Sequence, residues 1–240
     1  MVVLLALAVL LTLSGCGGGG GEVDNTPGAS LPYVPLTVGT QWRYDYTKYT
    51  QPAAALAAKS LPWPRSNRGA VGGSKADPVT VENLVQVTGT QMIDGSPWAA
   101  IVSQLVGSNP APAVYARHNS QGFLRKQSLG GAPFYMIHNP IAVGTTWVVS
   151  YVYQGSAYQE TYEIVALDQT VSVPAGEYTN CLQIENTLKV TGQPDDVISY
   201  WYAPNVGEVK EERRVGANLT WTMQLKAYAP GTSPSASLLR

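Results

Sequence analysis

Apolar and polar residues alternate along most of this chain, which is the pattern of β-strands with one buried face. In residues 41–46 every second side chain is aromatic, and residues 146–153 place tryptophan, valine and tyrosines on one face in the same way. Valines occupy alternate positions in much of 79–87. The period of two predicts that each of these segments turns its apolar side chains toward a common core.

Turn signals separate the predicted strands. Asp94-Gly95 predicts a hairpin between strands at 85–92 and 98–106, because both turn residues tolerate positive φ angles. Strands this close in sequence pair antiparallel, since a parallel crossover needs a dozen or more residues. The one helical candidate, 53–59, is too short to be more than a helical turn. We therefore expect an all-β fold with few or no helices.

Two pairs of similar segments, in the same order, indicate an internal repeat. Residues 35–42 and 140–147 share a proline, an aliphatic residue, valine, glycine, threonine and tryptophan, and 115–126 loosely parallels 202–210. The spacing is near a hundred residues, too long for a solenoid repeat. The prediction is two tandem antiparallel β-meander repeats that form either one twisted sheet or a sandwich.

Low-complexity segments suggest where these repeats begin and end. Glycine-rich residues near the start, an Ala-, Pro- and Gly-rich stretch within the first repeat and a loose last segment lack strand periodicity. The expected organisation is a signal peptide at 1–15, a Gly-rich tether at 16–30, repeat 1 at 31–136 with an insertion at 51–78, repeat 2 at 137–228 and a flexible tail at 229–240.

The start of the chain predicts its location. A run of roughly twelve apolar residues would span only about 18 Å as a helix, short of the roughly 30 Å hydrocarbon core of a bilayer. It ends in Leu13-Ser14-Gly15-Cys16, which resembles the lipobox of bacterial lipoproteins, although no Lys or Arg precedes the run. The resemblance implies cleavage before Cys16 and acylation, palmitate included, of that cysteine. The alternative is an ordinary signal peptide that happens to end near a cysteine.

Further motifs resemble uncharacterised families of secreted bacterial β-proteins. They are the opening Pro-Leu-Thr-Val-Gly-Thr-Gln-Trp at 35–42, the turn Val-Pro-Ala-Gly-Glu-Tyr at 173–178 and the hairpin Tyr-Ala-Pro-Asn-Val-Gly-Glu-Val-Lys at 202–210. These motifs describe turns and core aromatic residues, so the resemblance implies a fold and an envelope address but no reaction. For a host with two membranes, Gly17 after the cysteine suggests the periplasmic face of the outer membrane.

Composition excludes some partners and leaves others open. Lys plus Arg number 15 and Asp plus Glu 16, for a formal net charge of -1, and the charges are dispersed. Nothing in this pattern predicts nucleic-acid binding, so the expected partner is the membrane itself, through Cys16. With Cys16 acylated, Cys181 is the last thiol and no internal disulfide can form, so we expect Cys181 to pack as a small core side chain.

No arrangement of residues predicts catalysis, a metal or a cofactor. The motifs G-x-S-x-G and H-E-x-x-H are absent, and the histidines His118 and His138 are expected at surface or half-buried structural positions. Asp195-Asp196 follows a turn sequence and should be solvated. The mixed charges of 208–214 predict an exposed or edge strand, because charges there discourage aggregation through the edge. We expect a protein that is not an enzyme.

The aromatic residues offer a lead to function. Six tryptophans and 14 tyrosines accompany only two phenylalanines, a set suited to half-buried sheets and binding surfaces. Trp63, held between prolines in the insertion, is a candidate contact for a ligand or partner, although it could also cover a sheet.

Three functions remain open at this stage. The leading hypothesis is a lipid-anchored, non-catalytic envelope protein whose sheet surface binds another envelope component, and an exposed aromatic patch beside Trp63 would favour it. The alternative is a carrier or chaperone of a hydrophobic ligand, which a cavity lined by tyrosines and valines would favour. The least favoured is an envelope hydrolase, which would require two carboxyl groups that face each other across a cleft.

Overall fold

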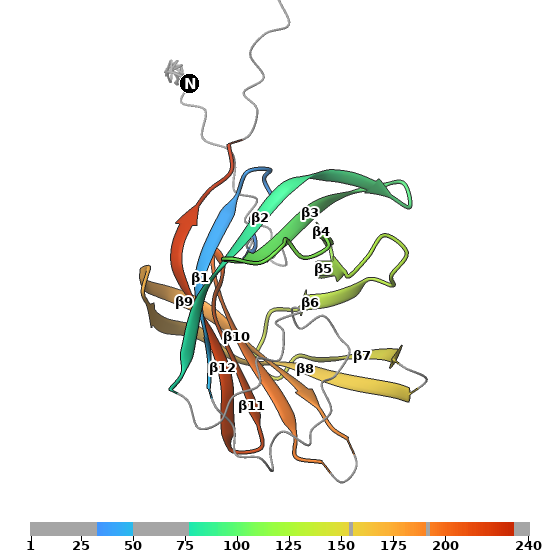
Figure 1. The fold of residues 1–240 in the computed structure, drawn as a ribbon. Helices are drawn as coiled ribbons and strands as arrows, with labels where there is room; N and C mark the ends of the chain where they lie inside the picture. The colour runs from blue at the N-terminus through green and yellow to red at the C-terminus, as the bar shows by residue number, and fades with distance from the viewer. Residues whose placement is uncertain (1–32, 50–76, 154–155, 191–192, 233–240) are drawn as a thin grey trace, which may run out of the picture.

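The computed structural model describes residues 33–49, 77–153, 156–190 and 193–232, and these form one antiparallel β-sheet (Figure 1). The strands are β1 (Gln41–Lys48), β2 (Val79–Ile93), β3 (Ser96–Leu105), β4 (Val114–Asn119), β5 (Gly122–Lys126), β6 (Phe134–His138), β7 (Thr146–Tyr153), β8 (Ser156–Val173), β9 (Gly176–Leu188), β10 (Asp196–Ala203), β11 (Gly207–Val215) and β12 (Asn218–Ala229). The all-β prediction is confirmed. Of the two arrangements that the sequence left open, one twisted sheet or a sandwich, the structure has one sheet.

The strand order shows how the sheet curls. Each half of the chain is a meander, and β1 pairs with β12, so the order runs β6-β5-β4-β3-β2-β1-β12-β11-β10-β9-β8-β7. The sheet bends round until its two end strands, β6 and β7, approach each other, and it is nearly closed (Figure 1). The indole of Trp147 in β7 bridges this seam by donating a hydrogen bond to the carbonyl of Tyr135 in β6, 2.9 Å away.

The inside of the curl holds the core, and the alternation in the sequence explains why. In β1 the side chains of Trp42, Tyr44 and Tyr46 are buried, while Arg43 between them is exposed and Asp45 is partly exposed. The same alternation buries Ile198, Tyr200 and Tyr202 in β10. Stacked and tilted aromatic pairs fill the interior, including Trp147 on Tyr162 at 5.4 Å between ring centroids.

The two similar motifs that precede β1 and β7 form the same turn. Gly39 and Gly144 have positive φ angles of 89° and 85°, a conformation that favours glycine. Each glycine donates a backbone hydrogen bond to a neighbouring strand, Gly39 to Val87 at 2.9 Å and Gly144 to Ile164 at 2.8 Å. The tryptophan that follows each turn donates a hydrogen bond from its indole nitrogen to a backbone carbonyl. For Trp42 the acceptor is the carbonyl of Val206. Duplication of the whole unit stays a prediction.

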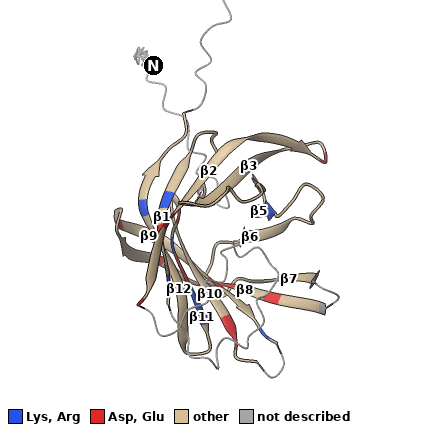
Figure 2. Ribbon diagram, viewed as in Figure 1, with Lys and Arg blue, Asp and Glu red and all other residues tan. Residues whose placement is uncertain are grey.

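The outer face of the central strands is charged with both signs. Arg43 lies 3.3 Å from Glu82, and Lys226 lies 3.4 Å from Asp45 and 3.2 Å from Glu82. Figure 2 shows Lys and Arg dispersed among Asp and Glu over the ribbon, without a large patch of one sign. Exposed ion pairs of this kind contribute little to stability, so they keep this face soluble in water more than they hold the fold together.

The prediction for residues 208–214 is wrong. β11 is an interior strand between β10 and β12, and the edges of the sheet are β6 and β7. Arg214 is exposed, but the other charged side chains of β11 are half-buried or buried, because β12 pairs with β11 and with β1 and so continues the sheet beyond β11. Asp196, expected in a solvated turn, is only 6% exposed and accepts two hydrogen bonds from Arg213 at 2.9 and 2.7 Å.

Cys181 is fully buried, as predicted, although not on the face expected. Simple alternation would place it with Gln183 and Glu185, whereas both Cys181 and Leu182 have 0% exposure. Asn180, with φ of 56°, and a shift in the β8–β9 register put two consecutive side chains inside. Burial raises the pKa of the Cys181 thiol to about 11, so the thiolate is disfavoured at neutral pH.

Candidate binding cavity

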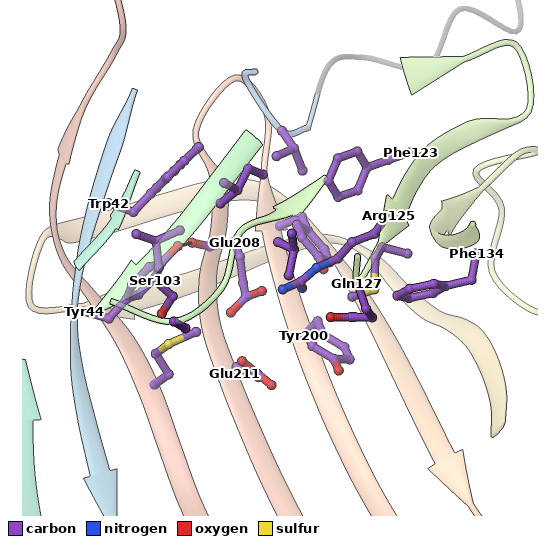
Figure 3. A pocket seen from close by; sticks show the side chains of 18 of the residues that line it. Trp42, Tyr44, Ser103, Phe123, Arg125, Gln127, Phe134, Tyr200, Glu208 and Glu211 are labelled. Atoms are coloured by element: carbon purple, nitrogen blue, oxygen red, sulfur yellow. Dashed lines mark hydrogen bonds between the residues drawn. The ribbon is translucent and has the colours of Figure 1, made fainter. Parts of the chain in front are cut away.

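A cavity of about 290 Å³ lies inside the curled sheet, bounded by residues from both halves of the chain (Figure 3). Seven aromatic side chains form much of its wall: Trp42, Tyr44, Phe123, Phe134, Tyr162, Tyr200 and Tyr202. The other apolar lining residues are three valines, two methionines, Ile101, Ala111 and Pro112. Ligand pockets in proteins measure roughly 300–1,000 Å³, so this cavity fits a small ligand.

Five polar side chains also face the cavity: Ser103, Arg125, Gln127, Glu208 and Glu211. Ser103 is already engaged, because its hydroxyl donates to the amide oxygen of Asn83 at 2.9 Å. Arg125 and Gln127 come from β5 and the residue after its end, and Figure 3 shows both directed into the centre of the cavity. Glu208 and Glu211 both come from β11.

The electrostatic environment of the cavity shows in Tyr202. Burial raises the pKa of its hydroxyl well above the usual value, and the carboxylates of Glu208 and Glu211 raise it further. Arg125 acts in the opposite direction and lowers the pKa of Tyr202. The hydroxyl of Tyr202 is therefore neutral, and it lies close enough to Glu208, Glu211 and Arg125 for their charges to shift its pKa.

Arg125 and Gln127 each bring a buried polar atom without a hydrogen-bond partner to the cavity wall. The Nε of Arg125 and the Oε1 of Gln127 are buried and form no hydrogen bond with any residue that the structure describes. Buried polar atoms in proteins are nearly always hydrogen-bonded, so two unpaired atoms in one cavity suggest that a bound molecule supplies the missing partners.

One rim of the cavity is formed by the first described residues. Val34 lines the cavity, and its carbonyl lies 2.7 Å from Nε2 of His118 in β4. Tyr33 is buried beside β8 and β9, where burial, then Asp168 and Cys181, raise the pKa of its hydroxyl. The chain therefore enters the fold across the end of the curl, in contact with both halves of the sheet.

The structure places both histidines that the sequence singled out. His118 is exposed and His138 is half-buried, in agreement with the sequence, and the ring of His138 lies 5.9 Å from that of Trp147. Within the described ranges, no cluster of three His, Cys, Asp or Glu side chains could hold a metal ion. Glu208 and Glu211 come from one strand, so they do not face each other across the cavity as paired glycosidase carboxyls do.

Several sites expected from the sequence cannot be located. Cys16, the predicted lipid attachment site, and Trp63, the predicted contact residue, lie outside the described residues. Over the described part of the chain, no helix has the length and hydrophobicity needed to cross a membrane.

Comparison with known proteins finds solved structures with a similar fold but no matching family. The sequence matches no protein-family model, and no curated protein is significantly similar to it. A crystal structure from Parabacteroides distasonis, described as a "putative lipoprotein", is similar with a TM-score of 0.50 and 14% identity, over 82% of this chain and 98% of that one. An exported protein from Bacteroides fragilis, described as "putative" and as having a YmcC-like fold, has a TM-score of 0.45 and 13% identity over 81% and 97%. The first of these establishes a shared fold.

Proposed function

We propose that this protein is a non-catalytic lipoprotein of the bacterial cell envelope that holds a small amphipathic ligand inside its curled sheet. The observation that carries the proposal is the cavity of about 290 Å³, with an aromatic wall and the unpaired Arg125 and Gln127 atoms. This proposal corresponds to one of the hypotheses that the sequence left open, the carrier of a hydrophobic ligand. Its expected lining of tyrosines and valines matches Tyr44, Tyr162, Val34 and Val85.

The chemistry of the wall supports binding. Apolar pockets with a few placed polar groups are the usual design of small-molecule sites, because the apolar surface provides affinity and the polar groups fix orientation. Apolar surface removed from water contributes about 25 cal/mol per Å². Binding of a ligand that covers the aromatic wall would therefore be favourable, because it removes this apolar surface from water.

The envelope location has separate support. Residues 13–16 resemble a lipobox, and the Parabacteroides distasonis protein that shares the fold is itself described as a "putative lipoprotein". Acylation at Cys16 would fix the protein to a membrane, and the periplasmic face of the outer membrane is the surface that we propose. Several acyl chains hold a protein firmly, since each buried methylene contributes about 0.8 kcal/mol.

A second candidate, binding of an envelope protein through the sheet surface, is favoured by one observation. Val148 and Val152 on the edge strand β7 are 52% and 73% exposed, and Val143 just before it is 61% exposed. Crosslinking in the native envelope would test it. A partner that is captured by the native chain and lost in the Val148→Lys, Val152→Lys variant would support this function, and identical crosslinks in both would count against it.

A cavity-filling substitution tests the carrier proposal. The purified mature protein in nanodiscs would be titrated with the neutral fluorescent probe N-phenyl-naphthylamine, with empty nanodiscs as the blank. We expect a saturable signal of one probe per chain that Ala111→Phe removes, because Ala111 lines the cavity. Ala132→Phe, at an exposed loop position, is the matched control. A signal unchanged by Ala111→Phe would refute binding in the cavity.

Export and anchoring need a test of their own. Cys16→Ser should move the protein out of the membrane fraction when cells are fractionated, because the sulfur that would carry the lipid is gone. The native chain should show an acylated first residue by mass spectrometry. An unmodified Cys16 in the exported native protein would refute anchoring without affecting the ligand site.

A further inference from the structure

The unpaired atoms of Arg125 and Gln127 differ in the hydrogen-bond partner that each needs. Nε of Arg125 carries a hydrogen and can only donate, whereas Oε1 of Gln127 can only accept. Arg125 and Gln127 are two residues apart on the same face of the chain, so their side chains enter the cavity side by side (Figure 3). A ligand that satisfies both must present an acceptor next to a donor.

The free energy of these two atoms depends strongly on whether they are paired. Burial removes the water molecules that would otherwise bond to a polar atom. If no new partner replaces them, the free-energy cost is larger than the free energy that an ordinary hydrogen bond contributes. A ligand that forms hydrogen bonds with both atoms removes the cost for both. A ligand that bonds to only one of them leaves the cost of the other. Selectivity among ligands of equal length should therefore follow the head group.

We propose that the cavity selects an uncharged amphipathic molecule whose head group is a carboxamide, with the carbonyl oxygen accepting from Arg125 and the N–H donating to Gln127. This inference rests on the proposed ligand-binding function and names its substrate class. The apolar part of the ligand lies against Phe123, Phe134 and Met136, which line the cavity beside the two polar groups.

A carboxylate head group fits this pair of residues less well. It would accept from Arg125, but it has no hydrogen to donate to Oε1 of Gln127, so that atom would stay unpaired. The acids Glu208 and Glu211 also line the cavity, so a further negative charge would be placed near two carboxylates. An ammonium head group would donate to Gln127 and be repelled by the guanidinium of Arg125.

Four ligands with the same six-carbon chain test the head group. Hexanamide, hexanoate, hexylamine and methyl hexanoate would be titrated by calorimetry into the mature protein in nanodiscs, with empty nanodiscs as the blank. The amide donates and accepts, the ester only accepts, and the other two carry charges of opposite sign. We expect hexanamide to bind about tenfold more tightly than each of the others, since each of the others leaves at least one of the two buried atoms without a partner.

Two variants assign the preference to its residues. Arg125→Met and Gln127→Met each remove one partner without breaking a hydrogen bond among the described residues, so we expect both to fold, which circular dichroism would verify. Each should reduce the advantage of hexanamide to about threefold or less. In Gln127→Met the amide and the ester should become equal. Arg43→Met, on the outer face of the sheet and away from the cavity, is the matched control and should leave the preference unchanged.

The outcomes separate this inference from the function on which it rests. Tighter binding of hexanoate or hexylamine than of hexanamide, or a preference for the amide that survives both variants, would overturn the carboxamide assignment. So would binding of the naphthylamine probe with no binding of any six-carbon ligand. Absence of the probe signal together with absence of all four ligands would instead refute the cavity as a binding site.

Discussion

Substitution of Gly122 by alanine should destabilise the protein far more than its location in a short hairpin turn implies. Gly122 begins β5, has φ of +141°, and lies opposite His138 in β6. A Cβ atom added there would lie 2.1 Å from the carbonyl oxygen of Ile137, 3.0 Å from its carbon and 3.1 Å from Cα of His138. All three are backbone atoms, so no side-chain rotation can make room.

The magnitude follows from two separate costs. A positive φ of this kind strains any residue with a side chain, by about 1–3 kcal/mol. Since real Cβ contacts essentially never fall below 3.0 Å, β5 and β6 must also move apart by about 1 Å at this point. Forced backbone shifts typically cost about 1–3 kcal/mol more. We expect a total of about 2–6 kcal/mol for Gly122→Ala.

Gly176→Ala is the matched control, because it isolates the first cost. Gly176 also begins a strand, β9, and has φ of +131°, but nothing lies within 4 Å of its added Cβ. Thermal unfolding followed by circular dichroism should show both variants lowered, with Gly122→Ala lower than Gly176→Ala by about 2–12 °C at roughly 2–4 °C per kcal/mol. Equal midpoints for the two variants would show that the close approach of β6 to Gly122 is not present in solution.

Two further predictions concern buried ionisable groups. Because burial raises the pKa of Cys181 from 9.0 to about 11, the folded chain keeps a proton that the unfolded chain loses, so stability should fall between pH 9 and 11. Cys181→Ala should flatten that fall in urea titrations, and an unchanged slope would contradict it. Arg213→Met removes both hydrogen bonds to the buried Asp196 and should cost about 3 kcal/mol in urea unfolding. Arg214→Met, which loses only an exposed pair at 3.3 Å, should cost under about 1 kcal/mol, and equal losses would refute the distinction.

Local rules account for the parts of the fold that the sequence predicts. The Asp94-Gly95 hairpin forms as expected, with φ of 51° and 72°, because two adjacent residues decide that geometry. The strand at 146–153 has the predicted bounds, and the predicted inward face holds for the half-buried Trp147, Val149 and Tyr151. The pairing of β1 with β12 joins residues about 180 positions apart, such as Trp42 and Tyr228, and no local pattern specifies it.

That long-range pairing explains the error at β11. Mixed charges on a strand are typical of an edge, and the sequence gives no sign that β12 continues the sheet to β1. Inside a curled sheet, a charged strand can be accommodated where its side chains find partners or a cavity. Arg213 pairs with Asp196, and Glu208 and Glu211 face the cavity. Two of the charges that suggested solvent, Glu208 and Glu211, therefore mark the interior polar surface.

Arg125, the central residue of the candidate site, was missed for a related reason. Phe123 and Arg125 share one face of β5, and Leu124 lies on the other. Both faces carry a buried apolar residue, because Leu124 packs with Ile93 and Trp98 in a second cluster outside the curl. The period of two therefore fits either orientation of the strand, and only the closed arrangement of the sheet shows that Arg125 points inward.

The entry of the chain into the fold connects the proposed anchor to the proposed ligand site. Val34 lines the cavity, and Cys16 lies only eighteen residues before it in the sequence. Eighteen residues of chain can reach at most about 60 Å, whatever their conformation. The rim formed by Tyr33 and Val34 would thus stay within reach of the bilayer surface. A small amphipathic ligand partitions to that surface, so an anchor of this length would hold the cavity where such a ligand is concentrated.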